Sequence, residues 1–138
     1  MEKTNPNKLW KSIISKNDIC VLATSSLSGK PEAATIRYAE DSNFMLYFRT
    51  TTKHRKYQNL KSNPKASIVI NMLPHTLQME GDVEELTHKK RNTALKILMK
   101  KEKAKIEPDG NLRFFRFTPR WVRIRIEGTE NPYHIIKG

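Results

Sequence analysis

The chain is poor in cysteine and has no long apolar run. Cys20 is the single cysteine among 138 residues, so an internal disulfide is excluded and the chain suits a reducing compartment. Its neighbours are apolar, so we expect a buried thiol. No apolar stretch reaches the roughly 20 residues that a membrane-spanning helix needs, and residues 1–8 lack the apolar core of a secretory signal. We therefore expect a cytoplasmic protein with no membrane partner.

Acidic residues are scarce as well. The 14 Asp and Glu oppose 26 Lys and Arg, which leaves a net charge of +12. Such a surplus favours anionic partners: nucleic acid, an acidic membrane or a phosphorylated ligand. No Asp or Glu occurs between Ser42 and Met79, so this segment is the best place for a bound phosphate. A second basic cluster, residues 89–105, is expected on a helix whose charges solvate its outer face.

The pattern of apolar residues predicts a mainly β protein with flanking helices, folded as one domain over residues 1–138. Two hairpins in succession indicate an antiparallel meander and a barrel rather than a doubly wound sheet. Gly81 is expected to mark a bulge, and Asn131-Pro132 to end the regular structure. Strands are predicted at 19–24, 32–39, 44–49, 66–70, 77–84, 112–117 and 120–127, and helices near 9–14, 53–62 and 88–105.

The segment from Asn43 to Ile70 carries the strongest functional signal. It has the pattern of a strand, a polar turn, a short basic helix and a second strand, and Asn63-Pro64 ends the helix. The threonines at 50–52 supply hydroxyl groups and a helix cap. Because a helix N-terminus has unpaired N–H groups, and Arg55 and Lys56 add positive charge there, we expect it to bind a phosphate group.

The order Thr50, Arg55-Lys56 and Asn63-Pro64 before a β-branched strand resembles the FMN-binding split-barrel proteins related to pyridoxamine 5'-phosphate oxidase. The resemblance also includes Val21-Leu22-Ala23-Thr24, Gly29-Lys30-Pro31, the segment from Pro74 to Gln78, and Gly81. It implies a six-stranded antiparallel split β-barrel. It also implies a homodimer that holds the cofactor FMN at its subunit interface.

The resemblance assigns roles to particular residues. Arg55 and Lys56 would bind the flavin phosphate, and Thr50 would contact the cofactor through its hydroxyl. His54 stands where relatives often carry serine. The backbone of the second barrel strand would hold the edge of the isoalloxazine ring, and the side-chain amide of Gln78 would meet that ring. The residues expected from this strand are Thr35, Ile36 and Arg37.

The resemblance is weaker at the substrate side. In the strand from Trp121 to Ile126, Arg125 falls where pyridoxamine phosphate oxidases carry tryptophan, and the chain ends at Gly138 without their longer basic region. We therefore expect an FMN-dependent oxidoreductase that acts on an unknown small molecule. The flavin would carry the hydride chemistry, so no catalytic side chain is nominated. The four histidines show no metal-binding spacing.

The expected partners are a second copy of the chain and a small-molecule substrate rather than nucleic acid, but two alternatives remain open at this point. The first is a module that binds nucleic acid or another anionic surface. Its aromatic residues would stack on bases while interleaved arginines hold phosphates. These aromatic residues are Phe114, Phe115, Phe117 and Trp121. The second alternative is a barrel that binds flavin, deazaflavin or haem without catalysis.

Overall fold

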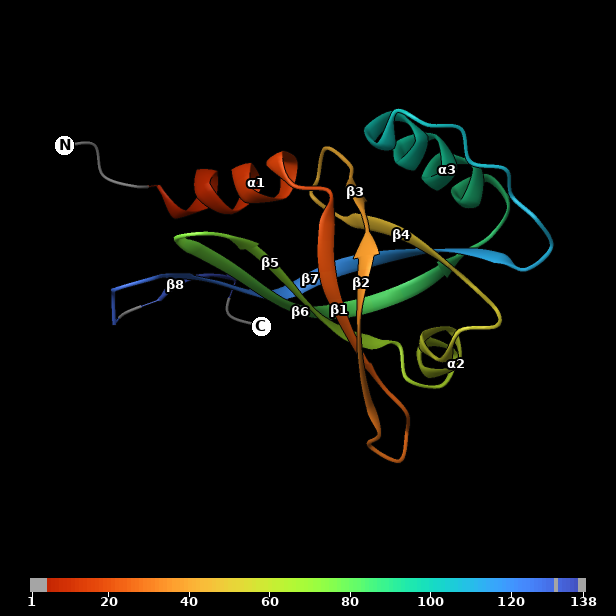
Figure 1. Cartoon of the computed structure of the whole chain (residues 1–138), viewed down its shortest axis with the longest axis horizontal. Coiled ribbons are helices and arrows are strands. Elements are labelled where there is room, and N and C mark those ends of the chain that lie inside the picture. The colour runs from red at the N-terminus through yellow and green to blue at the C-terminus, as the bar shows by residue number, and fades with distance from the viewer. Residues whose placement is uncertain (1–4, 131, 137–138) are drawn as a thin grey trace.

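The computed structural model describes residues 5–130 and 132–136, and these contain eight strands and three helices (Figure 1). The helices are α1 (Pro6–Lys16), α2 (Arg55–Ser62) and α3 (His88–Glu102). The strands are β1 (Ile19–Ser25), β2 (Pro31–Arg37), β3 (Ala39–Glu40), β4 (Leu46–Thr51), β5 (Lys65–Met72), β6 (His75–Leu86), β7 (Leu112–Ile126) and β8 (Tyr133–Ile136). None of the helices in these ranges is long and apolar enough to cross a membrane.

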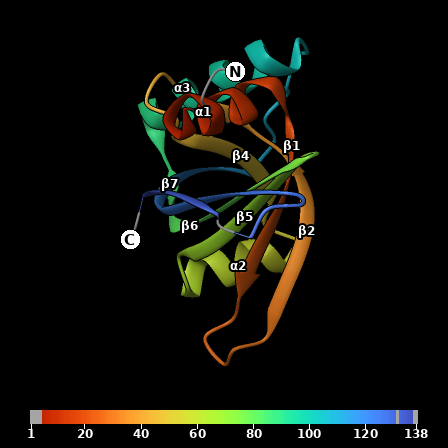
Figure 2. The same cartoon turned by 90° about the vertical axis from the view of Figure 1, so that its left-hand side faces the viewer.

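The strands form one antiparallel sheet that curls back on itself (Figure 2). Its order is β2-β1-β5-β6-β7-β4-β3, with β8 beside β7. The two ends of this order, β2 and β3, are separated in sequence by Tyr38 alone, so they bring the sheet's edges together. Counted as one interrupted strand, β2 and β3 complete the expected six-stranded split barrel, to which β8 adds a further strand. The described residues contain no backbone ladder between β2 and β4, and the barrel is split there.

Alternation along the strands fills the barrel with apolar side chains. Leu22, Ile68 and Phe48 are almost fully buried inside it, and Ile13 and Ile14 of α1 close one end. A smaller cluster forms between the sheet and α3, where helical spacing turns Ala94 and Leu98 inward. Cys20 is 2% exposed, as expected, and burial raises the pKa of its thiol to about 12.

Several predicted element boundaries were wrong. The strand expected from residue 44 begins at Leu46, because Phe44 has a φ of 60° and turns the chain. The strand expected over 32–39 is interrupted at Tyr38, whose hydroxyl donates to the Ile14 carbonyl at 2.7 Å.

The C-terminal part of the chain also differs from expectation. The two strands expected around Thr118-Pro119 form one continuous strand, β7. Regular structure also resumes after Asn131-Pro132, because Tyr133–Ile136 pairs with β7 as β8. Asn131 itself lies outside the described residues.

Gly81 does mark a bulge, as predicted. The pairing of β6 with β7 shifts between Glu80 and Gly81, so that Gly81 lies opposite Pro119 and Arg120 is the extra residue. The carbonyl oxygen of Thr118 approaches so closely that a Cβ atom on Gly81 would lie 2.1 Å from it. Glycine is therefore required here by space.

Candidate functional site

The split in the barrel holds a pocket with a volume of about 270 Å³. Strand β2 forms one wall, strand β4 the opposite wall, and the start of α2 the floor. Six of the eight residues predicted to bind the cofactor line it: Thr35, Ile36, Arg37, Thr50, His54 and Lys56. Arg49, Thr51 and Leu112 complete the lining. The fold thus brings residues as far apart in the chain as Thr35 and Leu112 to the wall of one pocket.

Strand β2 brings hydrogen-bonding backbone groups to this pocket. It pairs with β1 through a register that places Thr35 opposite Val21 and Arg37 opposite Ile19. Its other edge faces the split. In an antiparallel edge strand, alternate residues direct their N–H and C=O groups away from the partner strand. The wall formed by β2 can therefore donate to and accept from a planar polar ligand.

The N-terminus of α2 brings positive charge and free N–H groups to the floor. The N-cap residue is His54, not one of the expected threonines, and its side chain makes no capping hydrogen bond. No acidic residue stands in the first turn of α2, so nothing satisfies the positive end of its dipole from within this turn. These features suit an anion.

Three side chains converge above this helix end. The buried Thr50 places its Oγ1 atom 3.1 Å from Nδ1 of His54, and Nζ of Lys56 lies 3.5 Å from the same nitrogen. Lys56 makes no ion pair with the part of the chain that the structure describes. The pocket is also lined by no Asp or Glu within that part. A hydroxyl, an imidazole and an ammonium group therefore meet at the wall of one pocket, with no described carboxylate beside them.

The two other cations of the pocket are held by carboxylates. Arg37 pairs with Asp18 at 3.0 Å near the surface, whereas Arg49 makes a two-pronged pair with the largely buried Glu102 of α3. Arg49 was missed in the sequence because its partner lies 53 positions away. The only available signal was an arginine within an otherwise apolar strand. The pair leaves Lys56 as the cation in this pocket that is free to neutralise a ligand.

Two predicted residues do not line this pocket. Arg55 turns away from it, its side chain is 69% exposed, and it pairs with Glu32 at 2.9 Å. Gln78 lies on β6, on the outer face of the sheet, and accepts a hydrogen bond from Arg123. The described chain does not bring them to the other six, and their roles stay predictions.

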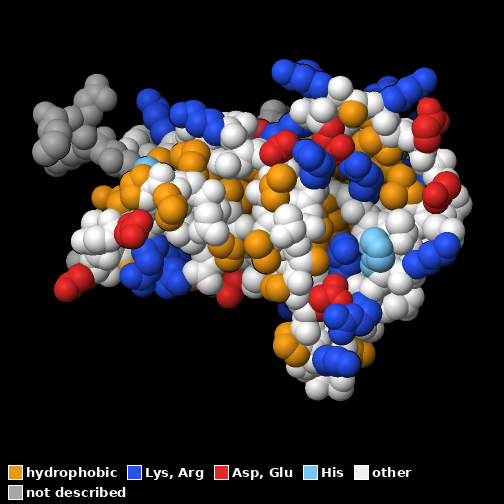
Figure 3. Space-filling model, viewed as in Figure 1, with side chains coloured by type: hydrophobic (Ala, Val, Ile, Leu, Met, Phe, Trp, Pro, Cys, Tyr) orange, Lys and Arg blue, Asp and Glu red, His pale blue; other side chains and the backbone are white. Residues whose placement is uncertain are grey.

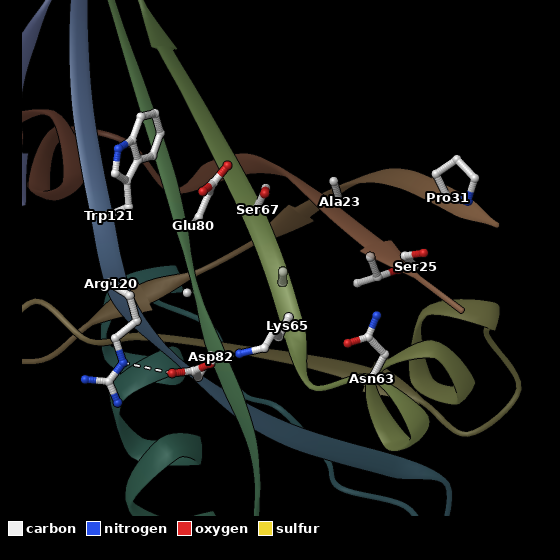
Figure 4. Close-up of a pocket in the computed structure, with 13 residues that line it drawn as sticks. Ala23, Ser25, Pro31, Asn63, Lys65, Ser67, Glu80, Asp82, Arg120 and Trp121 are labelled. Carbon is white, nitrogen blue, oxygen red and sulfur yellow. Dashed lines mark hydrogen bonds and ion pairs between the residues drawn. The ribbon is translucent and has the colours of Figure 1, made fainter. Parts of the chain in front are cut away.

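A larger hollow of about 640 Å³ lies over the outer face of β1, β5, β6 and β7 (Figure 4). A row of paired residues crosses these strands: Ala23, Ser67, Glu80 and Trp121. Arg120 and Lys65 both pair with Asp82, at 2.8 and 3.0 Å, and these contacts hold the pKa of its carboxyl below the usual range. Gln78 shares this face, because it stands two residues from Glu80 on the same strand.

The aromatic run of β7 does not provide a surface for bases. Phe114, Phe115 and Phe117 are at most 1% exposed and belong to the two apolar clusters. Alternation turns Phe115 and Phe117 into the barrel, while Phe114 lies on the opposite face and is covered by α3. The nucleic-acid argument that rested on base stacking by these phenylalanines was therefore wrong.

Comparison with known proteins agrees with this fold. The profile of the family described as pyridoxamine 5'-phosphate oxidase matches residues 7–126. No curated protein sequence matches the chain. Among solved structures, the chain resembles a heme binding protein from Mycobacterium smegmatis, with 16% identity and a TM-score of 0.80 over 97% of this chain and 60% of that one.

Two further structures are similar. One is ChuZ of Campylobacter jejuni, with 12% identity and a TM-score of 0.81 over 98% of this chain and 61% of that one. The other is a pyridoxamine 5'-phosphate oxidase-related, FMN binding protein from Nostoc punctiforme, with 15% identity and a TM-score of 0.68, covering 97% and 91%. The chain spans about 60% of the first two proteins' length. With the profile match over most of its residues, the chain belongs to the pyridoxamine 5'-phosphate oxidase family.

Proposed function

We propose that this protein binds FMN in the pocket at the split of the barrel and uses it as an oxidoreductase on a small molecule. The observation that carries the proposal is the floor of this pocket. It combines an uncapped helix N-terminus, the Thr50 hydroxyl and the ammonium group of Lys56, with no carboxylate in the described lining. The similar protein from Nostoc punctiforme is described as FMN binding, which supports the choice.

The residues present fit the chemical groups of FMN. Its phosphate is a dianion that needs N–H donors and a cation, and these are supplied by the first turn of α2 and by Lys56. Its ring edge carries carbonyl and N–H groups, which the free edge of β2 at Thr35, Ile36 and Arg37 can meet. The bound flavin supplies hydride transfer, and the protein supplies orientation and electrostatics.

A second copy of the chain would complete the site. Pockets that enclose a small molecule span about 300–1,000 Å³, and the pocket of one subunit, at about 270 Å³, is too small and open to enclose a flavin alone. Ile19 and Val21 are 47% and 38% exposed on β1, directly opposite Arg37 and Thr35. Covering this apolar strip with a second subunit would bury it and would bring the partner's outer sheet face, which carries Gln78, to the ring.

The proposed dimer can be tested by placing a charged side chain in its interface. Replacing Val21 with lysine places a cation in the proposed interface, and we expect the variant to be a monomer in light scattering while the wild type is a dimer at micromolar concentration. This monomeric variant should bind FMN more weakly than the wild type, because it lacks the partner's part of the proposed site. Leu73 is 75% exposed in the turn between β5 and β6, so Leu73→Lys is a matched control that should remain dimeric. A wild-type monomer that binds FMN tightly would contradict the shared site.

The cofactor and the activity can be tested in sequence. The visible spectrum of the purified protein, reconstituted with FMN and passed through a desalting column, should show a retained flavin. Haem is the competitor, because the similar protein from Mycobacterium smegmatis is described as heme binding, and a Soret band with no flavin spectrum would overturn the FMN assignment. Anaerobic addition of reduced nicotinamide should then bleach the flavin faster than it bleaches free FMN. Tight FMN binding without reduction by any common donor would contradict the oxidoreductase and leave a flavin carrier.

A further inference from the structure

Helix α3 carries much of the chain's positive charge in a position that the proposed flavin site does not use. Residues 88–105 contain eight Lys and Arg and one acidic residue, Glu102. Figure 3 shows cationic side chains projecting from the upper surface, over α3. This helix packs on the outside of the barrel, against β3, β4 and β7.

The cations of this helix fall into two groups. Four have partners within the protein: Lys90 pairs with Glu84 at 3.1 Å, Lys101 pairs with Glu40, Lys105 pairs with Glu107 at 3.9 Å, and Arg91 lies 5.5 Å from the ring of Phe114. The second group is exposed and makes no ion pair within the described residues. It consists of Lys89, Lys96, Lys100 and Lys103, which we call the α3 lysine row.

The α3 lysine row is straight and points directly away from the barrel. Its members are separated by seven, four and three residues, and at about 100° per residue the three within α3, Lys89, Lys96 and Lys100, fall within a sector of roughly 40°. Lys103 continues the row as the C-cap of the helix, with a left-handed backbone. The buried side chains Ala94 and Leu98 lie on the opposite side of the helix. At about 1.5 Å per residue, the row is about 21 Å long. A single file of exposed ammonium groups therefore stands on a rigid support.

We propose that the α3 lysine row binds the phosphate backbone of a nucleic-acid duplex without reading its sequence. One strand of a duplex carries a phosphate about every 3.4 Å along the axis, so a row of this length runs beside roughly six phosphates. Lysine supplies point charges, which suit backbone contacts. No aromatic side chain lies within the exposed face of α3 to stack on a base, and its one amide, Asn92, stands among four lysines, so we expect binding to be mainly electrostatic.

A membrane surface is the less favoured partner. A helix that lies in a lipid interface inserts an apolar face, and on α3 that face is already packed against the barrel. The large apolar side chains that are exposed in the described part of the chain lie elsewhere: Ile19, Val21, Leu27, Leu73 and Tyr133. A polyanion that approaches α3 from outside would meet these lysines together with the exposed, uncharged Asn92 and Thr93.

The experiment compares two variants of equal charge. In the row variant, Lys89, Lys96, Lys100 and Lys103 are all replaced by glutamine. In the control variant, four exposed lysines from other surfaces, Lys8, Lys11, Lys16 and Lys30, are replaced in the same way. Fluorescence anisotropy with a labelled DNA duplex of about 20 base pairs measures binding between about 50 and 200 mM salt.

We expect the row variant to bind at least tenfold more weakly than the wild type at about 50 mM salt. The slope of log K against log salt should fall in magnitude by about 3 to 4, since each lost phosphate contact removes about 0.9. The control variant should keep its slope to within about one contact. Circular dichroism and urea unfolding check that both variants fold. If the fourfold variant does not, the double variants Lys89→Gln/Lys96→Gln and Lys100→Gln/Lys103→Gln should each lower the slope by about 2.

Three results would overturn the proposal. Equal weakening in both variants would mean that only net charge matters. Absence of duplex binding by the wild type would exclude a nucleic-acid duplex as the partner of the α3 lysine row. Tighter binding to phosphatidylserine vesicles than to the duplex, at equal phosphate concentration, would assign the row to a membrane.

Discussion

Replacing Lys56 with glutamate should abolish FMN binding at micromolar concentration. Lys56 is the cation at the floor of the pocket that no described carboxylate holds, 3.5 Å from His54 and beside the uncapped start of α2. A charge-assisted hydrogen bond is worth about 1.5–3 kcal/mol, and the new carboxylate adds repulsion to the phosphate dianion. We expect a loss of at least about 3 kcal/mol, which weakens binding by more than a hundredfold. Fluorescence quenching of FMN on titration with the protein measures it.

A matched control makes this result specific. Lys53 is exposed just before α2 and does not line the pocket, so Lys53→Glu makes the same charge change nearby. It should weaken FMN binding by less than about tenfold, because exposed charges are screened by solvent and salt. Riboflavin, which lacks the phosphate, should bind the wild type and Lys56→Glu with similar weak affinity. Wild-type FMN affinity in Lys56→Glu would place the phosphate elsewhere.

Replacing Gly81 with alanine should destabilise the barrel more than any surface substitution. The new Cβ would lie 2.1 Å from the Thr118 carbonyl oxygen and 3.0 Å from the ring of the buried Phe117. Relief requires a backbone shift in the longest pairing of the sheet, between β6 and β7, because a carbonyl cannot rotate away as a side chain can. Overpacking of this kind costs on the order of 3 kcal/mol. The midpoint of urea unfolding should fall accordingly.

Gly110 provides the control for this substitution. It lies in the turn before β7, where an added Cβ would meet no atom within 4 Å and φ is not positive, so Gly110→Ala makes the same chemical change in open space. Its free energy of unfolding should stay within about 0.5 kcal/mol of the wild type. Equal stability of Gly81→Ala and the wild type would mean that the bulge can relax, and that Gly81 is not required by space.

Features that depend on neighbouring residues could be predicted from the sequence. Alternation predicted most of the strands, Asn63-Pro64 ended α2 where expected, and Gly81 marked the bulge. The resemblance to the family added the choice of β2, β4 and α2 as the walls of a site. Six of the residues it indicated line one pocket. Whether they bind FMN awaits the experiments above.

The errors occurred where a distant partner overrides a local preference. Proline at 119 predicted a break in the chain, yet β7 continues. Its pairing with β4 has ended at Phe117, and the bulge opposite Gly81 accommodates a residue without an N–H group. Likewise, the phenylalanines of β7 have the sequence pattern of a surface that stacks on bases, but the folded sheet and α3 bury them.

The sequence by itself determined the local elements, the basic character of the chain and the family, because hydrophobic period, turn chemistry and residue order are written along the chain. Only the tertiary structure decided which cationic side chains lack a carboxylate partner and are available to bind an anion. It paired Arg55 with Glu32 and Arg49 with Glu102 across 23 and 53 positions, and left Lys56 and the α3 lysine row without a carboxylate among the described residues. An ion pair forms when two side chains meet within about 4 Å, and for residues so far apart in sequence the fold alone fixes that distance.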